Sequence, residues 1–412
     1  MTHPIDEAPR RICWLLHGDE GYGVQRAVLN LMAGIARAGH TPMAVLLDDG
    51  PMAIALQNHG TEIIRGDFGR VKGLTGTAIS KLSQLQRNRR DMPHIAGRLA
   101  KCLHGRQIDV IHFLAPTHVD LGGRLTNKNN ALPVWEMANT VGANLPLRLS
   151  RLFFQWTCWR HRVLVLANSG YTGKTLGSWP IQPVIFHLGV DPLYFDPAAV
   201  DAVSRSELGI PESAIVLAVV ARIHPAKGQD LVIAAMHDLY SPPSRPLHLL
   251  LLGGARDTSY CDRLRDLIRS KNLESRVHLL GNVADPHRYY PAIDIPINSR
   301  INPEPFGLSV VEALMMARPP LVYALGGPAE TVLDGTTGWH LREPTARCLA
   351  AGLRRAVGDE ESWPRMRAAA RAHALAHFTI EKQTERYLTA LTSVDLRGKH
   401  EPSGKPLRGD VT

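Results

Sequence analysis

Short apolar runs alternate along the chain with amphipathic stretches of helical period. In the first half the runs are Arg11–Leu16, Met43–Leu47, Thr61–Ile64, Val110–Leu114, Pro133–Met137, Val163–Ala167 and Pro183–Phe186. Helical patterns lie between most of them, beginning with Val24–Ala38, which stops at Gly39. Apolar runs of this length predict buried strands, and their alternation with helices predicts a largely parallel sheet with helices on both faces.

A second series of the same kind follows a loop rich in Asp and Pro, from Asp191 to Pro211. Its apolar runs are Ile215–Val220, Leu247–Leu252, Arg276–Leu280, Ile293–Asn298, Pro320–Tyr323 and Gly338–Leu341. Helical patterns begin at Asp230, Thr258, Ser309 and Thr345, and two more, Glu361–His377 and Ile380–Leu391, close the series. We therefore expect an α/β protein with two doubly wound, Rossmann-like domains facing a cleft, with ligands at the carboxyl ends of the strands.

These patterns divide the chain. We place the N-terminal domain at residues 10–190 and the C-terminal domain at 191–375. A length of 412 residues agrees with at least two domains. The polar end of the chain, 397–412, has the composition of a disordered tail.

Composition excludes several classes of protein. With 44% hydrophobic and 21% charged residues, the chain is neither collagen-like nor wholly disordered. Its five cysteines are widely spaced and form no C-x-x-C pair, so we expect neither a disulfide framework nor a zinc site. No apolar segment follows a basic start, and no apolar run is long enough to span a bilayer. We expect a cytoplasmic protein without a signal peptide.

The charge leaves three kinds of partner open. A net charge of +9 favours phosphates, nucleic acid or an acidic membrane surface. Nine Lys or Arg residues and one acid, Asp91, lie between Arg70 and Arg106. This segment is either the solvated side of one or two helices or a surface for an anionic acceptor or lipid. No aromatic interleaving or binding module accompanies it, so nucleic acid ranks third.

Aromatic residues and arginines cluster in Leu149–Arg162, which reads LSRLFFQWTCWRHR. The stretch is either a core helix with a solvated edge or an interfacial helix that docks on a membrane. The second interpretation suits a lipid-linked acceptor and a protein at the inner face of the membrane.

Glycines and cations follow several predicted strands. The loop from Gly18 to Gly23 reads G-x-x-G-x-G, which differs from the dinucleotide fingerprint and also fits a plain tight turn. Arg222 and Lys227 follow the run at 215–220. They are either unrelated surface cations or a clamp that holds a diphosphate and neutralises a departing phosphate. Gly253-Gly254 ends the next strand as a close-approach loop or a simple turn.

The segment Asn302–Glu312 is the most informative one. Its carboxylates, Glu304 and Glu312, are eight residues apart, about 12 Å along a helix axis, which suits gripping opposite ends of one ligand. Ser309-x-x-Glu312 also has the form of a capping box, in which Glu312 bonds to a backbone amide instead. Farther on, Gly326-Gly327 and an acid, Glu330, form a second glycine turn that enters a helix.

Together these motifs resemble the family 4 retaining glycosyltransferases of the GT-B fold. The resemblance rests on Arg222 and Lys227, Gly253-Gly254, EPFGLSVVEAL and GGPAETVLDGTTGW in that order, with Gly21–Gln25 in place of the family's glycine loop. It extends to about residue 390. It implies an acceptor-binding N-terminal domain, a sugar-nucleotide-binding C-terminal domain, and a final helix, about 376–392, that packs back on the first domain.

The resemblance also implies residue roles. Arg222 and Lys227 would hold the diphosphate, and Glu304 would lie beside the donor sugar. Further donor contacts would come from Gly23, Gly253, Asn282, Val283, Phe306, Gly307, Leu308 and Glu312, with Glu312 at the ribose and Asn282 and Val283 at the base. Retention is commonly explained by front-face attack, so no protein nucleophile is expected. The donor is then a UDP- or GDP-sugar, and no metal or other cofactor is expected, which agrees with the lack of a D-x-D motif.

Two places depart from the family pattern. Asn139 stands where many members carry a histidine near the reacting sugar, and an amide hydrogen-bonds a hydroxyl but is not a base. His112 and His118 are therefore candidates for acceptor binding, or else structural histidines. The linker His187–Asp191 reads HLGVD where Asn-Gly-Val-Asp is usual, which bears on how the domains meet.

The sequence thus predicts a retaining glycosyltransferase. It would move a sugar from a nucleotide-diphosphate sugar to a glycan or lipid-linked glycan in bacterial polysaccharide or glycolipid biosynthesis, with peripheral membrane association and no nucleic acid partner. Two alternatives stay open. One is a sugar-nucleotide epimerase or phosphorylase on the same fold, and the other is a non-catalytic sugar-nucleotide-binding partner.

Overall fold

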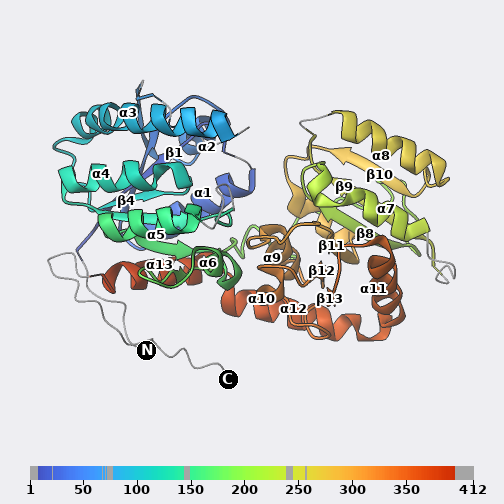
Figure 1. Ribbon diagram of the computed structural model, residues 1–412. Helices are drawn as coiled ribbons and strands as arrows, with labels where there is room; N and C mark the ends of the chain where they lie inside the picture. Colours follow the sequence, from blue (N-terminus) through green and yellow to red (C-terminus); the bar gives the residue numbers. More distant parts are fainter. Residues whose placement is uncertain are drawn as a thin grey trace.

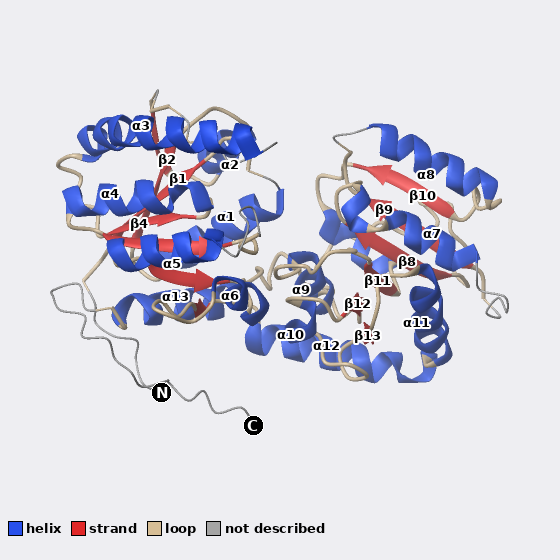
Figure 2. Cartoon of the chain, viewed as in Figure 1, coloured by secondary structure: helices blue, strands red, loops and turns tan. Residues whose placement is uncertain are grey.

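In a computed structural model of the protein, the described residues are 8–20, 22–66, 68, 69, 71, 78–142, 149–237, 245–255 and 258–394. The predicted disordered tail lies outside them, as do Gly21 and Arg70. Two parallel sheets form the framework of the molecule and lie side by side (Figure 1, Figure 2).

The first sheet has seven parallel strands. In spatial order they are β3 (Glu62–Arg65), β2 (Thr41–Leu46), β1 (Arg11–Leu16), β4 (Val110–Phe113), β5 (Leu132–Met137), β6 (Leu164–Ala167) and β7 (Val184–Ile185). Its central strands are buried and mostly apolar because both faces are covered, whereas the edge strands β3 and β7 are partly exposed. In β1, Trp14 faces one core and Leu15 the other.

Helices cover the two faces of this sheet in separate sets (Figure 1). On one face lie α1 (Tyr22–Arg37) and α2 (Pro51–Asn58). On the other lie α3 (Ala78–Leu103), α4 (Val119–Asn129), α5 (Leu149–His161) and α6 (Gly170–Leu176), together with the short 3-10 helix η1 (Pro116–His118).

The second sheet has six parallel strands. In spatial order they are β10 (Val277–Gly281), β9 (Leu247–Leu252), β8 (Ile215–Val220), β11 (Ile295–Asn298), β12 (Leu321–Tyr323) and β13 (Trp339–Leu341). One face packs on α7 (Gln229–His237), α8 (Thr258–Ser270) and α11 (Ala346–Gly358), and the other on α9 (Leu308–Met315), α10 (Pro328–Thr331) and α12 (Trp363–His377). Three 3-10 helices, η3 (Pro225–Lys227), η4 (Pro286–Ala292) and η5 (Glu360–Ser362), complete the domain.

The predicted fold class is confirmed. Every predicted strand begins and ends within two residues of an observed strand, and the two sheets form two Rossmann-like domains. Most strands were predictable because they are buried on both sides and so read as continuous apolar runs.

The last helix, α13 (Ile380–Thr392), returns to the first domain and packs against α1 (Figure 1). Gly34 of α1 lies so close to this helix that a Cβ there would come within 1.9 Å of the Thr384 hydroxyl. Farther along, the Tyr387 hydroxyl lies 3.0 Å from Nδ1 of His112 on β4. The end of the chain thus contributes to the core of the N-terminal domain.

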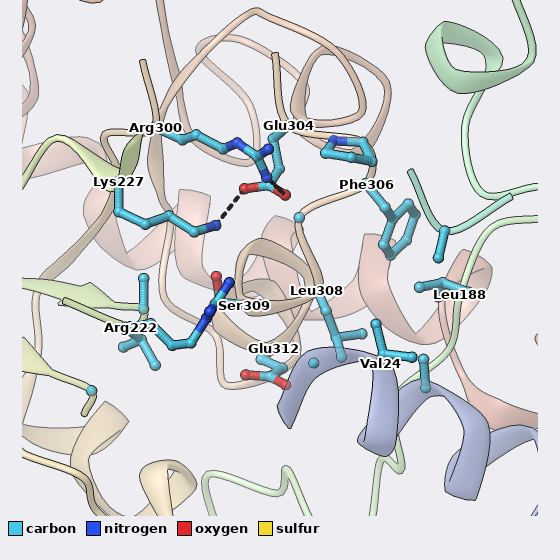
Figure 3. A pocket seen from close by; sticks show the side chains of 18 of the residues that line it. Val24, Leu188, Arg222, Lys227, Arg300, Glu304, Phe306, Leu308, Ser309 and Glu312 are labelled. Carbon is cyan, nitrogen blue, oxygen red and sulfur yellow. Dashed lines mark hydrogen bonds and ion pairs between the residues drawn. The ribbon is translucent and has the colours of Figure 1, made fainter. Parts of the chain in front are cut away.

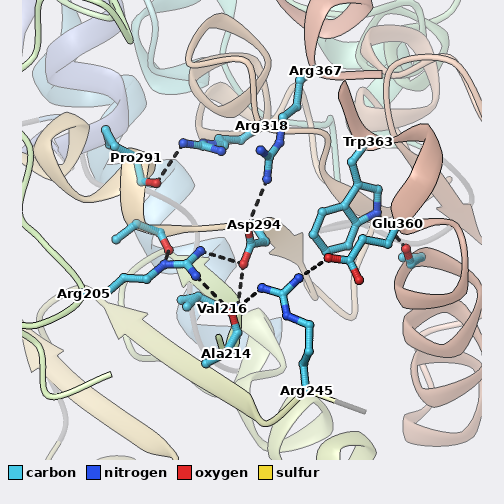
Figure 4. A network of polar contacts seen from close by, with 12 residues as sticks. Arg205, Ala214, Val216, Arg245, Pro291, Asp294, Arg318, Glu360, Trp363 and Arg367 are labelled. Atoms are coloured by element: carbon cyan, nitrogen blue, oxygen red, sulfur yellow. Dashed lines mark hydrogen bonds and ion pairs between the residues drawn. The ribbon is translucent and has the colours of Figure 1, made fainter. Parts of the chain in front are cut away.

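A buried carboxylate fastens the segment after the domain linker to the second domain (Figure 4). Asp294, only 6% exposed, accepts hydrogen bonds from Arg205 at 2.8 Å, from Arg367 at 2.9 Å and from the Val216 amide at 3.0 Å. Nearby, burial lowers the pKa of Arg318 to about 10. Because Arg205 follows the linker directly, this network fixes where the second domain begins.

The aromatic stretch singled out in the sequence forms α5, which has one buried side and one exposed side. Gln155 and Cys158 are buried, as a core helix requires. Leu152, Trp156 and Trp159 are instead more than half exposed. No helix among the described residues is long and apolar enough to cross a bilayer.

Candidate active site

A cavity of about 440 Å³ lies between the two domains. Its lining residues follow the carboxyl ends of strands from both sheets, where ligands of doubly wound sheets bind. The cavity brings together the predicted catalytic and donor-binding residues, namely Gly23, Asn139, Arg222, Lys227, Gly253, Asn282, Val283, Glu304, Phe306, Gly307, Leu308 and Glu312. The sequence separates them by up to 289 positions, and the fold places them in one cleft.

Glu304 holds two cations at once (Figure 3). Its Oε2 accepts from Nζ of Lys227 at 2.8 Å, and its Oε1 accepts from a guanidinium nitrogen of Arg300 at 2.7 Å. The carboxylate side chain is 12% exposed, and the two cations are about a quarter exposed. The arrangement places two positive charges where they are able to contact an anionic ligand. The carboxylate between them is able to accept hydrogen bonds from hydroxyl groups.

A pair of glycines supports the loop that carries Glu304. Gly326 has φ of +84°, and a Cβ there would come within 2.2 Å of the Glu304 carbonyl. Gly327 donates its amide to that same carbonyl at 2.8 Å, and its own Cβ would meet Phe306 at 2.5 Å. No larger residue fits at either position, so the glycine turn seen in the sequence sets the position of the loop that carries Glu304.

The same loop opens helix α9 toward the cavity. Gly307, with φ of +89°, is the N-cap residue, and no side chain caps the helix. The capping box expected as an alternative for Ser309 and Glu312 is therefore wrong. The amides at the start of α9 and the positive end of its dipole face the cleft, which suits a diphosphate. Phe306, which also lines the cavity, is almost completely buried.

Arg222, an exposed cation just after β8, also lines the part of the cavity that the C-terminal domain forms (Figure 3). Its carbonyl accepts from the Gln229 side chain at 2.8 Å, which fixes the backbone at this point. Next to it, a Cβ at Gly253 would lie 2.0 Å from the Ala221 carbonyl. The two strand ends therefore approach closely, and Gly253 permits it.

Glu312 makes an ion pair across the domain boundary. Its Oε1 lies 3.2 Å from a guanidinium nitrogen of Arg26 on α1, and both side chains are nearly buried. Burial raises the pKa of Glu312 above its ordinary value, and the positive charge of Arg26 opposes this rise. The Arg26 guanidinium also lies 4.8 Å from the ring of Phe195 in the linker. The residue expected at the ribose thus connects both domains in this structure.

The polar side chains on the N-terminal wall of the cavity are two amides and one carboxylate, among apolar residues such as Val24 and Leu114. Asn139 is exposed there, and Asn168 donates to the Ala138 carbonyl at 3.2 Å while its buried Oδ1 has no hydrogen-bond partner within the described residues. Glu136, 2% exposed, also lines the cavity. These groups are suited to bind hydroxyls of a ligand.

The structure corrects the expectation for two histidines. His112 and His118 are completely buried, and neither lines the cavity, so they do not contact an acceptor there. His112 lies between Glu136, 3.1 Å from its Nε2, and Tyr387 of α13. His118 packs against the ring of His17 at 4.8 Å between centroids. Both occupy strand or helix ends under other side chains, which a sequence pattern does not distinguish from a site.

A further contact joins the domains below the cleft. The carboxylate of Glu330, on α10, accepts from the amides of Gly170 and Tyr171 at 2.8 Å each, at the start of α6. Ser169 donates its hydroxyl to the Pro305 carbonyl at 2.5 Å. The second glycine motif and the loop that carries Glu304 are therefore both joined to the other domain.

Several residues of this region, among them Arg300, Arg26 and Glu136, were not predicted. Arg300 lies four positions before Glu304, a spacing that indicates an ion pair in a helix but not in a loop. Arg26 gives no local signal because its partner is 286 positions away. Glu136 stands in an apolar run, PVWEM, where a lone acid was a visible irregularity.

Comparison with known proteins agrees with this geometry. Residues 201–373 match the family model described as glycosyl transferases group 1. The D-inositol 3-phosphate glycosyltransferase of Kineococcus radiotolerans is 36% identical over 230 residues, covering 50% of this chain and 52% of the relative. That of Nocardia farcinica is 31% identical over 202 residues, covering 46% and 44%. The chain thus spans about half the length of the curated relatives it matches.

Solved structures share the whole fold. A glycosyltransferase from Rickettsia africae superposes with a TM-score of 0.78 at 19% identity, covering 94% of this chain and 99% of that one. HepE of Anabaena, solved in complex with UDP, gives 0.77 at 20% identity, covering 93% and 100%. Two Rossmann-like domains with a cleft between them, together with these superpositions, define a protein of the GT-B fold. The match of residues 201–373 to the glycosyl transferases group 1 model agrees with the predicted resemblance to glycosyltransferases.

Proposed function

We propose that the protein is a retaining glycosyltransferase that moves a sugar from a nucleotide-diphosphate sugar to a hydroxyl acceptor. The observation that carries the proposal is the cluster of Lys227, Arg300 and Glu304 beside the start of α9, inside a cleft between two domains. Cations and helix amides stabilise the charge that develops on a departing diphosphate.

In this proposal each group has one task. The bond between the anomeric carbon and the diphosphate oxygen breaks, and Lys227, Arg222 and the α9 amides stabilise the negative charge. The acceptor oxygen bonds to the anomeric carbon on the face that the diphosphate leaves, and its proton passes to the diphosphate. Glu304 holds the donor sugar by its hydroxyls. No protein nucleophile, metal or other cofactor takes part.

The acceptor half of the cleft is formed by the N-terminal domain. Asn139 and Asn168 present amide groups to hydroxyls of the acceptor, and Glu136 adds a carboxylate. We propose a glycan or lipid-linked glycan as acceptor, with the protein cytoplasmic at the inner face of the membrane and active in bacterial polysaccharide or glycolipid synthesis. The relatives named D-inositol 3-phosphate glycosyltransferases make a small phosphorylated polyol the second acceptor to test.

A thermal-shift panel tests donor binding first. UDP, GDP, ADP and their sugars are each added to the purified protein. A ligand that binds only the folded state stabilises it by about 2.7 kcal/mol when its concentration is about a hundred times its dissociation constant. The melting temperature rises as a result. We expect one nucleotide class to raise the melting temperature and the others to leave it unchanged. No shift with any nucleotide contradicts the proposal.

Substitution of the cation cluster tests the chemistry. With the donor identified, Glu304→Gln and Lys227→Met are each expected to lower the rate of sugar transfer by about 100- to 1000-fold because stabilisation of the leaving group or its sugar is lost. Asp262→Asn, which breaks an exposed ion pair with Arg265, is the control. Unchanged transfer in both site variants refutes the assignment, and release of free nucleotide with an epimerised sugar instead identifies an epimerase.

A further inference from the structure

One side of α5 exposes a continuous apolar surface. Leu152, Trp156 and Trp159 are four and three positions apart, so they share one helix face, and Phe153 lies beside them. Their exposed fractions are 61%, 52%, 59% and 45% in the order Leu152, Trp156, Trp159, Phe153. Exposed patches of this kind on a soluble domain mark an interaction surface, whereas single exposed apolar residues do not.

The loop that Gln155 holds against α5 exposes another tryptophan. The Gln155 side chain donates to the carbonyls of Leu176, Gly177 and Ile181, and so holds the loop between them against α5. This loop carries Trp179, which is 84% exposed. Three of the seven tryptophans of the chain are therefore exposed on α5 or on the loop fastened to it.

The charged side chains that α5 itself places beside the apolar surface are arginines, while Asp120 of α4 pairs with His161 at the end of the helix. Arg151 packs on the loop at Gly177, and the Arg160 guanidinium lies 5.4 Å from the centroid of the Trp156 ring. From Leu149 to Arg162 the chain has no Asp or Glu. The layer of α3, α4 and α5 (Figure 1) carries ten Lys and Arg residues against two acids in its sequence. This outer layer therefore favours an anionic partner.

We infer that the exposed face of α5, with Leu152, Phe153, Trp156 and Trp159 as its apolar part and Arg151 and Arg160 at its border, docks on an anionic lipid bilayer. Tryptophan side chains favour the boundary between headgroups and acyl chains, and arginines contact anionic headgroups. Two signals, apolar and electrostatic, are what a stable but reversible membrane contact needs.

Charge argues against a second copy of the chain as the occupant. A twofold dimer would set this face against itself, so the cations of α3, α4 and α5 would approach their own copies. A bilayer with anionic lipids offers the opposite charge. The position of the helix also suits the proposed function, because α5 begins ten residues after Asn139, which lines the cleft. A lipid-linked acceptor would then enter the cleft from the membrane beside it.

Vesicle sedimentation tests the inference without donor or acceptor. The full chain is mixed with vesicles of phosphatidylcholine alone, or of phosphatidylcholine containing about one third phosphatidylglycerol. We expect binding to the anionic vesicles that weakens with salt, and at least about tenfold weaker binding by Trp156→Ser/Trp159→Ser. Arg160→Gln/Arg162→Gln is expected to weaken binding about threefold and to reduce its salt dependence. Ile54→Ser, at 62% exposure on the opposite face of the domain, is the matched control.

The outcomes separate this inference from the proposed function on which its biological role rests. Absence of binding to anionic vesicles, or equal binding by the double tryptophan variant, overturns the docking surface. If the wild type is a dimer that does not bind vesicles, and the tryptophan variant is a monomer, the inference is also overturned. The face is then assigned to a second copy of the chain. Transfer to a water-soluble acceptor should be unchanged in that variant. If neither the wild type nor any variant transfers sugar, but the wild type still binds anionic vesicles, the proposed function is refuted and the docking surface stands.

Discussion

At the scale of single residues, the ion pair between Arg26 and Glu312 is nearly buried at the cleft and joins the two domains. The two side chains are 13% and 5% exposed and come from different domains. A buried carboxylate is stable as an anion only while a cation compensates for its lost hydration. Arg26 therefore allows Glu312 to be charged in the folded protein, beside the cavity where a ribose is expected.

Removing that cation should destabilise the protein. Arg26→Met leaves Glu312 buried without its partner, which is expected to cost about 3 kcal/mol at neutral pH. The pKa of Glu312 is already raised by burial, and it rises further when Arg26 is removed. A carboxyl group with a raised pKa in the folded state destabilises folding above that pKa, and the loss disappears as the group is protonated. The variant should therefore regain stability as the pH falls toward 5, measured by urea unfolding across pH.

The double variant Arg26→Met/Glu312→Gln controls for packing. It removes the charge as well as its partner, so it should recover most of the lost stability at neutral pH and show no gain on acidification. Equal stability of the single and double variants at every pH would mean that the pair contributes nothing.

Residues that line the cavity could be singled out from the sequence where they lie just after a strand. Arg222 and Gly253 are examples, because the carboxyl ends of parallel strands meet at one edge whatever the rest of the fold does. Arg26 could not be found in this way, since its role depends on how two domains meet. His112 is a different case, because a position near a strand end made it a candidate although its side chain does not reach the cavity. It precedes a strand end by one residue and points into the core.

At the scale of elements, two glycine turns of the C-terminal domain differ in what surrounds them. Gly326 and Gly335 both have positive φ, +84° and +71°. A Cβ at Gly326 would overlap the Glu304 carbonyl at 2.2 Å, whereas a Cβ at Gly335 would meet nothing closer than 3.6 Å. The first turn therefore positions the loop from Glu304 to Gly307, and the second only reverses the chain.

Alanine substitution separates these two roles. Gly335→Ala should cost about 1 kcal/mol for the left-handed backbone and leave sugar transfer unchanged. Gly326→Ala carries the same backbone cost and must also displace the loop of Glu304. A shift of about 1 Å in a catalytic group costs about 100-fold in rate. Thermal unfolding and transfer rates of both variants test this, and similar rates for the two would contradict a positioning role for Gly326.

The elements themselves were largely predictable, and their exceptions have local causes. Strands buried on both faces are recorded in the sequence as apolar runs, so β8 and β9 were predicted residue for residue. The capping box at Ser309 was the reasonable alternative by pattern. It fails because Gly307 takes the N-cap position with a backbone that only glycine adopts easily, which places Ser309 inside the first turn.

At the scale of the whole molecule, polar contacts around the linker join the two domains beside an apolar cluster that has residues of both. Glu330 binds the first amides of α6, and its Oε2 lies 3.4 Å from Nε2 of His187 in the linker. Ser169 holds the Pro305 carbonyl beside it. A contact of this kind lies near the point where the chain passes between domains, so it is able to act as a pivot while the cleft above it opens and closes around a donor.

The charge of Glu330 makes this pivot sensitive to pH. Burial tends to raise the pKa of Glu330, but hydrogen bonds from His187 and from the amides of Gly170 and Tyr171 outweigh it, so the pKa is lowered. A carboxyl group with a lowered pKa in the folded state contributes stability that is complete above its ordinary pKa, 4.5, and is lost as the pH falls through the lowered value. Glu330→Gln should therefore cost about 1 to 2 kcal/mol at neutral pH and nothing in strong acid.

The same variant distinguishes a pivot from a merely stabilising contact. If Glu330 sets the domain arrangement, Glu330→Gln raises the KM for the donor several-fold with a smaller change in kcat, because the closed cleft is populated less often. Glu361→Gln, at an exposed position of the same domain, should change neither stability nor KM. Acid unfolding and donor saturation curves supply both readouts. A stability loss with an unaltered KM would leave Glu330 as a helix cap, and the two domains would then close about some other point of contact.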